Sequence, residues 1–267
     1  MDEGAFIVRR AILTGLVFIL AMTLFGCSGK GDVVQVATDA AYAPMESMDK
    51  DKFVGFDVDF LDAVMKEAGL SYKLTNTGWD TMLESVKTGK EYKMGVSSVS
   101  ITDDRALTYD YSLPYFESTN MILVNEGSDV KSALDLKDKK VAVQNGTTAD
   151  ELMSGIMGAS NANLSKYDTN VLAFMDLEKG GVDAAVADIA IVREYMKNNP
   201  NKKFVSIPDT DNFGAEYYGI LLPKGSDLKA KLDPAIKKII EDGTYTTIYK
   251  KWFGEEPDTG KLLEAGK

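Results

Sequence analysis

The segment KKVAVQNGTTADELMSGIMG, residues 139–158, is the most informative part of the chain for its architecture. The apolar run over 139–146 predicts a strand, and the spacing over 147–158 predicts a helix. This strand-then-helix order has already occurred upstream, so the segment begins the pattern a second time. Two beginnings of an alternating β/α pattern predict two lobes, each with a largely parallel sheet covered by helices.

The residues on either side continue the two patterns. Upstream, the sequence predicts strands over 33–39, 71–77, 93–101 and 120–126, and helices over 56–69 and 81–89. Asp80 is expected to cap the second of these helices and Gly89 to end it. Downstream, it predicts helices over 171–181, 189–200, 232–243 and 245–254, and strands over 182–188, 202–207 and 217–223.

The lone strands at 120–126 and 215–222 are natural crossings between the lobes. We therefore expect lobe 1 to comprise 33–122 with 218–254, and lobe 2 to comprise 123–217. The hinge crossings are expected near 123–126 and 215–218, and residues 255–267 form a C-terminal tail.

The composition excludes several classes of function. The 267 residues include no histidine and one cysteine, and the formal net charge is −11. Catalytic triads built on histidine are impossible, and a transition-metal site is not expected. A single cysteine cannot form an intramolecular disulfide. The acidic balance argues against a nucleic-acid partner, and no motif in the sequence calls for a cofactor or a metal.

The N-terminal segment is typical of an export signal. Arg9 and Arg10 precede an uncharged, mostly apolar run over 11–25, which is shorter than the roughly 20 residues of a spanning helix. The run ends in LFGC at 24–27, which resembles the signal of bacterial lipoproteins. Residues 1–26 are thus predicted to be a signal peptide, Cys27 to be lipidated, and 27–32 to form a tether. An ordinary signal peptide with an incidental cysteine is the alternative.

In open α/β sheets, ligands bind beyond the carboxyl ends of the strands. One such end carries the stretch GVSSVSITDDR, residues 95–105, in which Ser97, Ser98 and Ser100 precede Arg105. If Thr102 caps a short helix, Arg105 lies in its first turn, where positive charge opposes the helix dipole. Arg105 is either a surface arginine paired with a neighbouring aspartate or a guanidinium aimed at a carboxylate. The serines either satisfy a turn or, since alternation points Ser98 and Ser100 the same way, form a polar floor.

Two other strand ends carry polar side chains. Asp188 ends the apolar strand VDAAVA and either caps the following helix or meets a ligand ammonium. Thr147 and Thr148 follow Gly146, and Thr148 with Glu151 fits a capping box. Capping and ligand binding are compatible here, because free N–H groups at a helix start can also hold a carboxylate.

Two aromatic residues and an acid lie near the same ends. Tyr42 follows the first strand, and Trp79 directly precedes the helix that Asp80 is expected to cap. A hydrophobic staple would pair Trp79 with residue 84, which is glutamate, so that structural role fails. Each ring is either part of the core or one half of a sandwich around a ligand side chain, best a cationic one. Asp39 could pair with the cationic end of such a ligand side chain.

At this point the chain resembles the bacterial extracellular solute-binding proteins of family 3, the amino-acid receptors of ABC importers. The similarity covers roughly 33–254. Its blocks, in order, are VATDAAYAPM, KFVGFDVDF, SSVSITDDR, YSLPYF, LKDKKVAVQNGTT, GGVDAAVAD and DGTYTTIYKKWFG. The serine-rich block is most similar to that of receptors for lysine, arginine, ornithine and histidine. The resemblance implies a periplasmic-binding-protein-like α/β fold, in which two lobes joined by two hinge strands close on a ligand.

The resemblance also implies how the ligand backbone is held. Arg105 would bind the α-carboxylate, helped by the backbone of Ser100 and Thr148. Asp188, the Ser98 carbonyl and the Ser100 hydroxyl would bind the α-ammonium. By the same resemblance, the cleft would include the remaining ligand-binding candidates, which are Asp39, Tyr42, Trp79, Ser97, Gln144 and Thr147.

The implied function is that of a monomeric, non-catalytic receptor, exported and lipid-anchored on the outer side of the cell membrane. It would deliver a free polar amino acid, preferably a basic one, to a membrane permease and its ATPase subunits. Three alternatives remain open. They are a receptor for a neutral polar amino acid such as glutamine or cystine, a sensory lipoprotein, and an enzyme like cyclohexadienyl dehydratase on the same scaffold.

Overall fold

The computed structural model describes residues 33–266 of the chain. The expected signal peptide, the lipidation site at Cys27 and the tether lie outside the described residues. Within 33–266, every helix is too short or too polar to cross a membrane.

The first lobe is built on a five-stranded sheet in the order β5-β1-β6-β15-β7. The strands are β1 (Val34–Thr38), β5 (Tyr72–Asn76), β6 (Met94–Gly95), β7 (Tyr109–Tyr111) and β15 (Leu221–Pro223). β1 runs parallel to β5 and β6, and β15 runs antiparallel to β6 and β7. Helices α2 (Phe56–Glu67) and α8 (Lys229–Glu241) bury one face of the sheet. Helix α3 (Trp79–Thr88) buries the other.

The second lobe repeats this plan with a sheet in the order β11-β10-β12-β9-β13. Its strands are β9 (Asn120–Asn125), β10 (Val141–Gln144), β11 (Leu164–Tyr167), β12 (Ala184–Asp188) and β13 (Phe204–Pro208). Successive strand side chains point to opposite faces, so Val141 and Val143 pack under α5 (Thr148–Met157) while Ala142 packs under α6 (Asn170–Lys179). Helix α7 (Ile189–Asn198) lies beside α6. The α/β fold with two lobes is as expected from the sequence.

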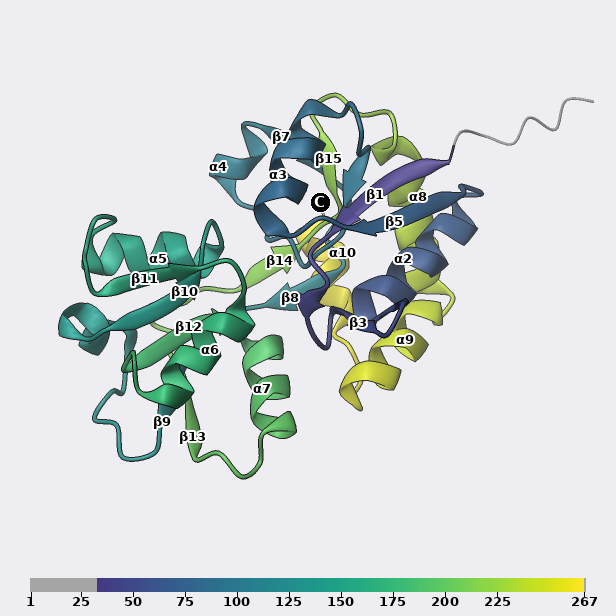
Figure 1. Ribbon diagram of the computed structural model, residues 1–267. Helices are drawn as coiled ribbons and strands as arrows, with labels where there is room; N and C mark the ends of the chain where they lie inside the picture. The colour runs from purple at the N-terminus through teal and green to yellow at the C-terminus, as the bar shows by residue number, and fades with distance from the viewer. Residues whose placement is uncertain (1–32, 267) are drawn as a thin grey trace, which may run out of the picture. The chain divides into compact units, whose positions relative to one another are not determined.

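Two short strands connect the lobes. β8 (Phe116–Ser118) and β14 (Glu216–Tyr218) pair with each other in an antiparallel ladder and run between the two sheets (Figure 1). The first crossing therefore comes earlier in the chain than the 123–126 expected, because β9 lies wholly inside the second sheet, between β12 and β13. The expected strand over 217–223 is divided between β14 and β15, which belong to different sheets.

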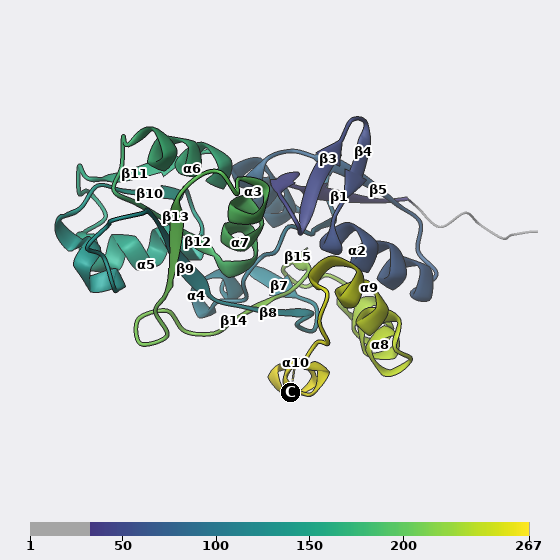
Figure 2. The same cartoon turned by 90° about the horizontal axis from the view of Figure 1, so that it is seen from below.

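The remaining elements complete the first lobe. A three-stranded sheet follows β1, made of β2 (Ala41–Tyr42), β3 (Glu46–Asp49) and β4 (Lys52–Val54). Helix α9 (Thr244–Phe253) adds rings to an aromatic core, in which the ring centroids of Phe60 and Tyr115 lie 4.3 Å apart. Helix α10 (Thr259–Ala265) ends the described chain, separate from α8 and α9 (Figure 2). Buried Leu262 anchors α10 to the core.

The end of α3 provides a test of the backbone geometry. Gly89 ends the helix in the left-handed region at φ 57°, and a Cβ there would lie 2.9 Å from Cγ of Pro223. Gly89→Ala should therefore lower the free energy of unfolding by about 1–2 kcal/mol in urea denaturation. Gly155→Ala is the matched control, because Gly155 lies within α5 with no atom near its Cβ position. That change should raise the free energy by about 0.5–1 kcal/mol. A neutral Gly89→Ala would contradict the assigned cap.

The two sheets place equivalent strand ends at the boundary between the lobes. In each sheet the chain passes from the second strand in the order to the edge strand beside it, and then to the third strand on the opposite side. In the first sheet these strands are β1, β5 and β6. Ligands of open α/β sheets bind where the strand order reverses in this way. The positions to examine are therefore the carboxyl ends of β1, β6, β10 and β12.

Candidate functional site

A small cavity, with a volume of about 20 Å³, lies at these four strand ends. This volume is close to that of a single water molecule, so the two lobes lie nearly in contact around the cavity. All the candidates for ligand binding named from the sequence line it. They are Asp39, Tyr42, Trp79, Ser97, Ser98, Ser100, Arg105, Gln144, Thr147, Thr148 and Asp188.

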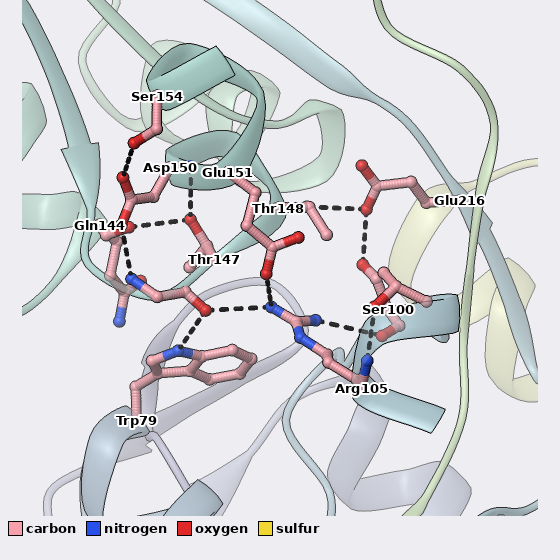
Figure 3. A network of polar contacts seen from close by, with 12 residues as sticks. Trp79, Ser100, Arg105, Gln144, Thr147, Thr148, Asp150, Glu151, Ser154 and Glu216 are labelled. Atoms are coloured by element: carbon pink, nitrogen blue, oxygen red, sulfur yellow. Dashed lines mark hydrogen bonds and ion pairs between the residues drawn. The ribbon is translucent and has the colours of Figure 1, made fainter. Parts of the chain in front are cut away.

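Arg105 is held by both lobes. Thr102 caps the short helix α4 (Asp103–Ala106), as expected, by accepting a hydrogen bond from the Arg105 amide. The guanidinium donates to the Ser100 carbonyl at 3.1 Å and, across to the second lobe, to the Gly146 carbonyl at 3.0 Å. Its ionic partner is Glu151 of α5, at 3.6 Å, and not an adjacent aspartate (Figure 3). With 9% of its side chain exposed, Arg105 is part of the cavity wall and not a surface residue.

Trp79 and the start of α3 differ from expectation. Gly78 occupies the N-cap position and Trp79 is the first residue of the helix, so Asp80 lies in the first turn and does not cap it. The Trp79 indole donates to the same Gly146 carbonyl that Arg105 contacts, at 3.2 Å (Figure 3). The guanidinium lies 5.6 Å from the centre of the Trp79 ring, within the range of a cation–π contact.

The serine stretch is not a regular strand. β6 ends at Gly95, and Ser98 has φ 51°, so the alternation argument that aligned Ser98 with Ser100 was wrong. The left-handed turn points the Ser98 amide at Asp57, with a 2.7 Å bond to its carboxylate. Ser97 donates its hydroxyl to Glu46 at 2.5 Å and accepts a bond from the Asp39 amide at 3.1 Å. Two serines of the stretch thus hold the loop in place.

Glu46 and Asp57 form a buried acidic pair that the sequence reasoning missed. Burial raises the pKa of Glu46 well above its ordinary value, and the nearby charge of Asp57 adds to this. Burial also raises the pKa of Asp57 to about 6, although bonds from Tyr115 and Ser98 oppose the shift. A glutamic acid that donates to an aspartate satisfies such a pair at neutral pH. The pair supports the serine loop from behind.

The start of α5 also differs from expectation. Thr147, not Thr148, occupies the N-cap, and its hydroxyl oxygen accepts a bond from the Asp150 amide at 3.3 Å. The Thr148–Glu151 capping box was therefore wrong, since Thr148 is already the first helical residue. Freed from capping, the Thr148 hydroxyl donates to Glu216 at 2.9 Å.

Gln144 connects the lobes at the end of β10. Its amide nitrogen donates to the Asp39 carboxylate at 3.0 Å, and its amide oxygen accepts a bond from Asn170 at 2.7 Å. Burial raises the pKa of Asp39, and the bond from Gln144 opposes the shift. Asp39 and Gln144 thus lie at the cavity wall as a bonded pair.

Asp188 stands at the N-cap of α7, but its side chain makes no capping bond. Its carboxylate instead accepts hydroxyl bonds from Tyr42 of the first lobe at 2.7 Å and from Tyr218 of β14 at 2.5 Å. Burial, followed by the charge of Glu216, raises the pKa of Asp188 to about 7, although the hydroxyl bonds from Tyr218 and Tyr42 oppose the shift. The carboxylate is therefore short of positive partners.

Three polar residues around the cavity were missed because they lie on or beside the crossing strands. Tyr218 bonds to Asp188, and Glu216 accepts bonds from Ser100 at 2.5 Å and from Asn120 at 2.5 Å. The available signal was a glutamate placed just before the apolar run YYGILLP. The role of Glu216 could not be recognised from this run, because a strand that crosses between lobes has the same apolar pattern as a strand buried within one sheet.

The charges around the cavity are unequal. Its lining contains two carboxylates, those of Asp39 and Asp188, and one guanidinium, that of Arg105. Among residues 33–266, no group of three or more acidic or thiol side chains is arranged to hold a metal ion. A site with excess negative charge favours a ligand with excess positive charge.

A cavity between two α/β lobes joined by two crossing strands defines the periplasmic-binding-protein-like class. The chain belongs to the bacterial extracellular solute-binding proteins, family 3, whose model matches residues 34–255. The family expected from the sequence blocks is thus confirmed.

Similar proteins include both curated sequences and solved structures. The chain is 37% identical to a probable histidine-binding protein of Neisseria gonorrhoeae, over 88% of this chain and 92% of that one. It is 34% identical to the putative ABC transporter arginine-binding protein 2 of Escherichia coli, over 83% and 91% respectively. The structure of ArtJ, an arginine-, lysine-, histidine-binding protein of Geobacillus stearothermophilus, is 54% identical. It superposes with a TM-score of 0.84 and covers 86% of this chain and 99% of its own.

Proposed function

We propose that the protein is the substrate-binding receptor of an amino-acid ABC importer and that it captures a free basic amino acid between its lobes. The observation that carries the proposal is the position of Arg105 and Asp188 in the lining of the same cavity. The two opposite charges come from different lobes and line one cavity. The names of the relatives, which describe receptors for histidine, arginine and lysine, support the same ligand class.

The mechanism follows from the chemistry of a zwitterion. Enclosing an amino acid removes water from both of its charges, so each charge needs a partner in the cavity. Arg105 would pair with the α-carboxylate and Asp188 with the α-ammonium. Because these residues belong to different lobes, a ligand contacts both only when the lobes have closed on it. Ligand binding and closure are therefore linked, with β8 and β14 absorbing the rotation.

The preference for a basic side chain rests on charge and aromatic surface. A basic amino acid carries one net positive charge, which matches the excess carboxylate of the lining. Tyr42 and Trp79 would flank the side chain, and Asp39 would meet its cationic end. A micromolar dissociation constant corresponds to about −8 kcal/mol, which a ligand of this size can supply without any covalent step.

The cellular role includes export and delivery. In this proposal the chain is lipid-anchored through Cys27, faces the periplasm or the cell exterior, acts as a monomer and passes its ligand to a membrane permease. The relatives compared above are binding proteins, and we place this chain with them and not with catalytic members of the fold.

A thermal-shift screen tests the ligand class. The twenty amino acids, ornithine and cystine are each added to the mature protein, and a true ligand raises the melting temperature. We expect arginine, lysine, histidine or ornithine to give the largest shift. A larger shift with glutamine or cystine would reassign the receptor to neutral polar ligands, and no shift with any amino acid would contradict the proposal.

A further inference from the structure

Glu216 occupies a central position that none of the sequence blocks indicated. It lies on the crossing strand β14 and accepts hydrogen bonds from both lobes (Figure 3). One carboxylate oxygen accepts from the Ser100 hydroxyl at 2.5 Å and from the Thr148 hydroxyl at 2.9 Å. The other accepts from the Asn120 amide at 2.5 Å. Ser100 and Thr148 line the cavity, so Glu216 bonds to the wall from behind.

The charge of Glu216 has no cationic partner. Among the ion pairs of residues 33–266 none involves this side chain, and its hydrogen-bond donors are all neutral. Such bonds to a charged acceptor are about twice as strong as bonds between neutral groups. Each of these donors therefore forms a strong hydrogen bond to the Glu216 carboxylate.

The bond to Glu216 determines whether the Ser100 hydroxyl donates or accepts a hydrogen bond in the cavity. A hydroxyl has one proton to donate and two lone pairs that accept. The proton of Ser100 is directed at Glu216, so only its lone pairs remain for the cavity. An oxygen in that state accepts from an ammonium and repels a carboxylate.

We propose that Glu216 is a positioning residue that orients the Ser100 hydroxyl as an acceptor for the ligand α-ammonium. This inference rests on the proposed function, because it assumes that an amino acid occupies the cavity. It adds a residue that selects for the ammonium without touching the ligand. Substrates that lack the ammonium gain nothing from Glu216.

Glu216→Gln tests the inference because it keeps the shape and removes the charge. The amide oxygen is needed by the Asn120 donor, so the new amide nitrogen faces Ser100 and Thr148. Ser100 then accepts from Gln and turns its own proton toward the cavity. The preference for arginine over 5-guanidinopentanoate, its analogue without the α-ammonium, should fall by about tenfold in calorimetry.

Glu117→Gln is the matched control. Glu117 lies on the partner strand β8 and pairs with Lys261 at 3.4 Å. It does not line the cavity but a separate groove, whose lining also includes Arg193 and Trp252. This variant should retain the wild-type preference. An equal loss of affinity for both ligands in Glu216→Gln, or an unchanged preference, would overturn the inference, since either result would mean that Glu216 only shapes the crossing strands.

A double-mutant cycle isolates the part played by Ser100. Ser100→Ala alone should reduce the same preference, and adding Glu216→Gln to it should change the preference by less than about twofold. A tenfold effect that persists without the Ser100 hydroxyl would rule out action through that group. The melting temperature of each variant verifies folding.

Failure of the proposed function can be distinguished from failure of the inference about Glu216. If the screen identifies another amino acid, the ratio is measured with that amino acid and its analogue without the α-ammonium, and the inference stands or falls on the result. If no amino acid binds, both proposals fail.

Discussion

Replacing Arg105 with alanine is expected to weaken binding of the cognate amino acid by about 3–5 kcal/mol. The physical reason is that a buried carboxylate would lose its ionic partner while still losing its water. The guanidinium is nearly buried and lies between the Ser100 and Gly146 carbonyls, so no neighbouring cation replaces it. Isothermal titration calorimetry with arginine measures the effect.

Two comparisons separate carboxylate binding from a general loss of structure. Agmatine, which is arginine without its carboxylate, should bind wild type and Arg105→Ala with similar affinity. Arg193→Ala is the matched control, since Arg193 is exposed and lines the separate groove. A loss below about 0.5 kcal/mol for arginine in Arg105→Ala would show that the carboxylate socket lies elsewhere.

Asp188→Asn is expected to weaken binding of the same ligand by about 2–5 kcal/mol, because the α-ammonium would be buried without its counter-charge. The amide keeps an oxygen that Tyr42 and Tyr218 can bond to, so the wall retains its shape. Calorimetry at pH 7.5 gives the loss, and the melting temperature of the free variant shows whether it folds. Retention of wild-type affinity would remove Asp188 from the ammonium site.

The same substitution should change the pH dependence. Burial raises the pKa of Asp188 to about 7 from an ordinary value of 3.8. Because the folded state binds the proton of Asp188 more tightly than the unfolded state does, this proton stabilises the fold. The stabilisation is fully present below pH 3.8 and is lost as the pH rises through about 7. The ammonium binds the ionised form, so wild-type affinity should fall by up to about tenfold per pH unit below 7. Asp188→Asn should lack this fall, and an identical pH profile would contradict the assignment.

The sequence predicted the cavity better than the bonds inside it. Strand ends are set by local apolar patterns, and parallel strands bring such ends together, so Asp39, Ser100 and Asp188 could be placed at one boundary. Arg105 was recognisable because a cation in a first helical turn opposes the dipole. These inferences need only short-range pattern and general topology.

The errors arose where two local solutions were equally good or where the partner is distant. Either threonine of the pair at 147 and 148 has an acid three residues later, and only the fold shows that Thr147 caps. Asp57 lies 41 residues before its partner Ser98, and Glu216 lies 116 residues after Ser100. No pattern along the chain predicts such contacts, because they are fixed by how the lobes and crossing strands pack.

The bonds from Gln144 to Asp39 and from Trp79 to Gly146 have an implication for how affinity can evolve. Both join one lobe to the other using protein atoms alone. Asp39, Gln144 and Trp79 also line the cavity, so each of them takes part in both lobe closure and the ligand environment. A substitution at any of the three would therefore change overall affinity and the ranking among ligands together.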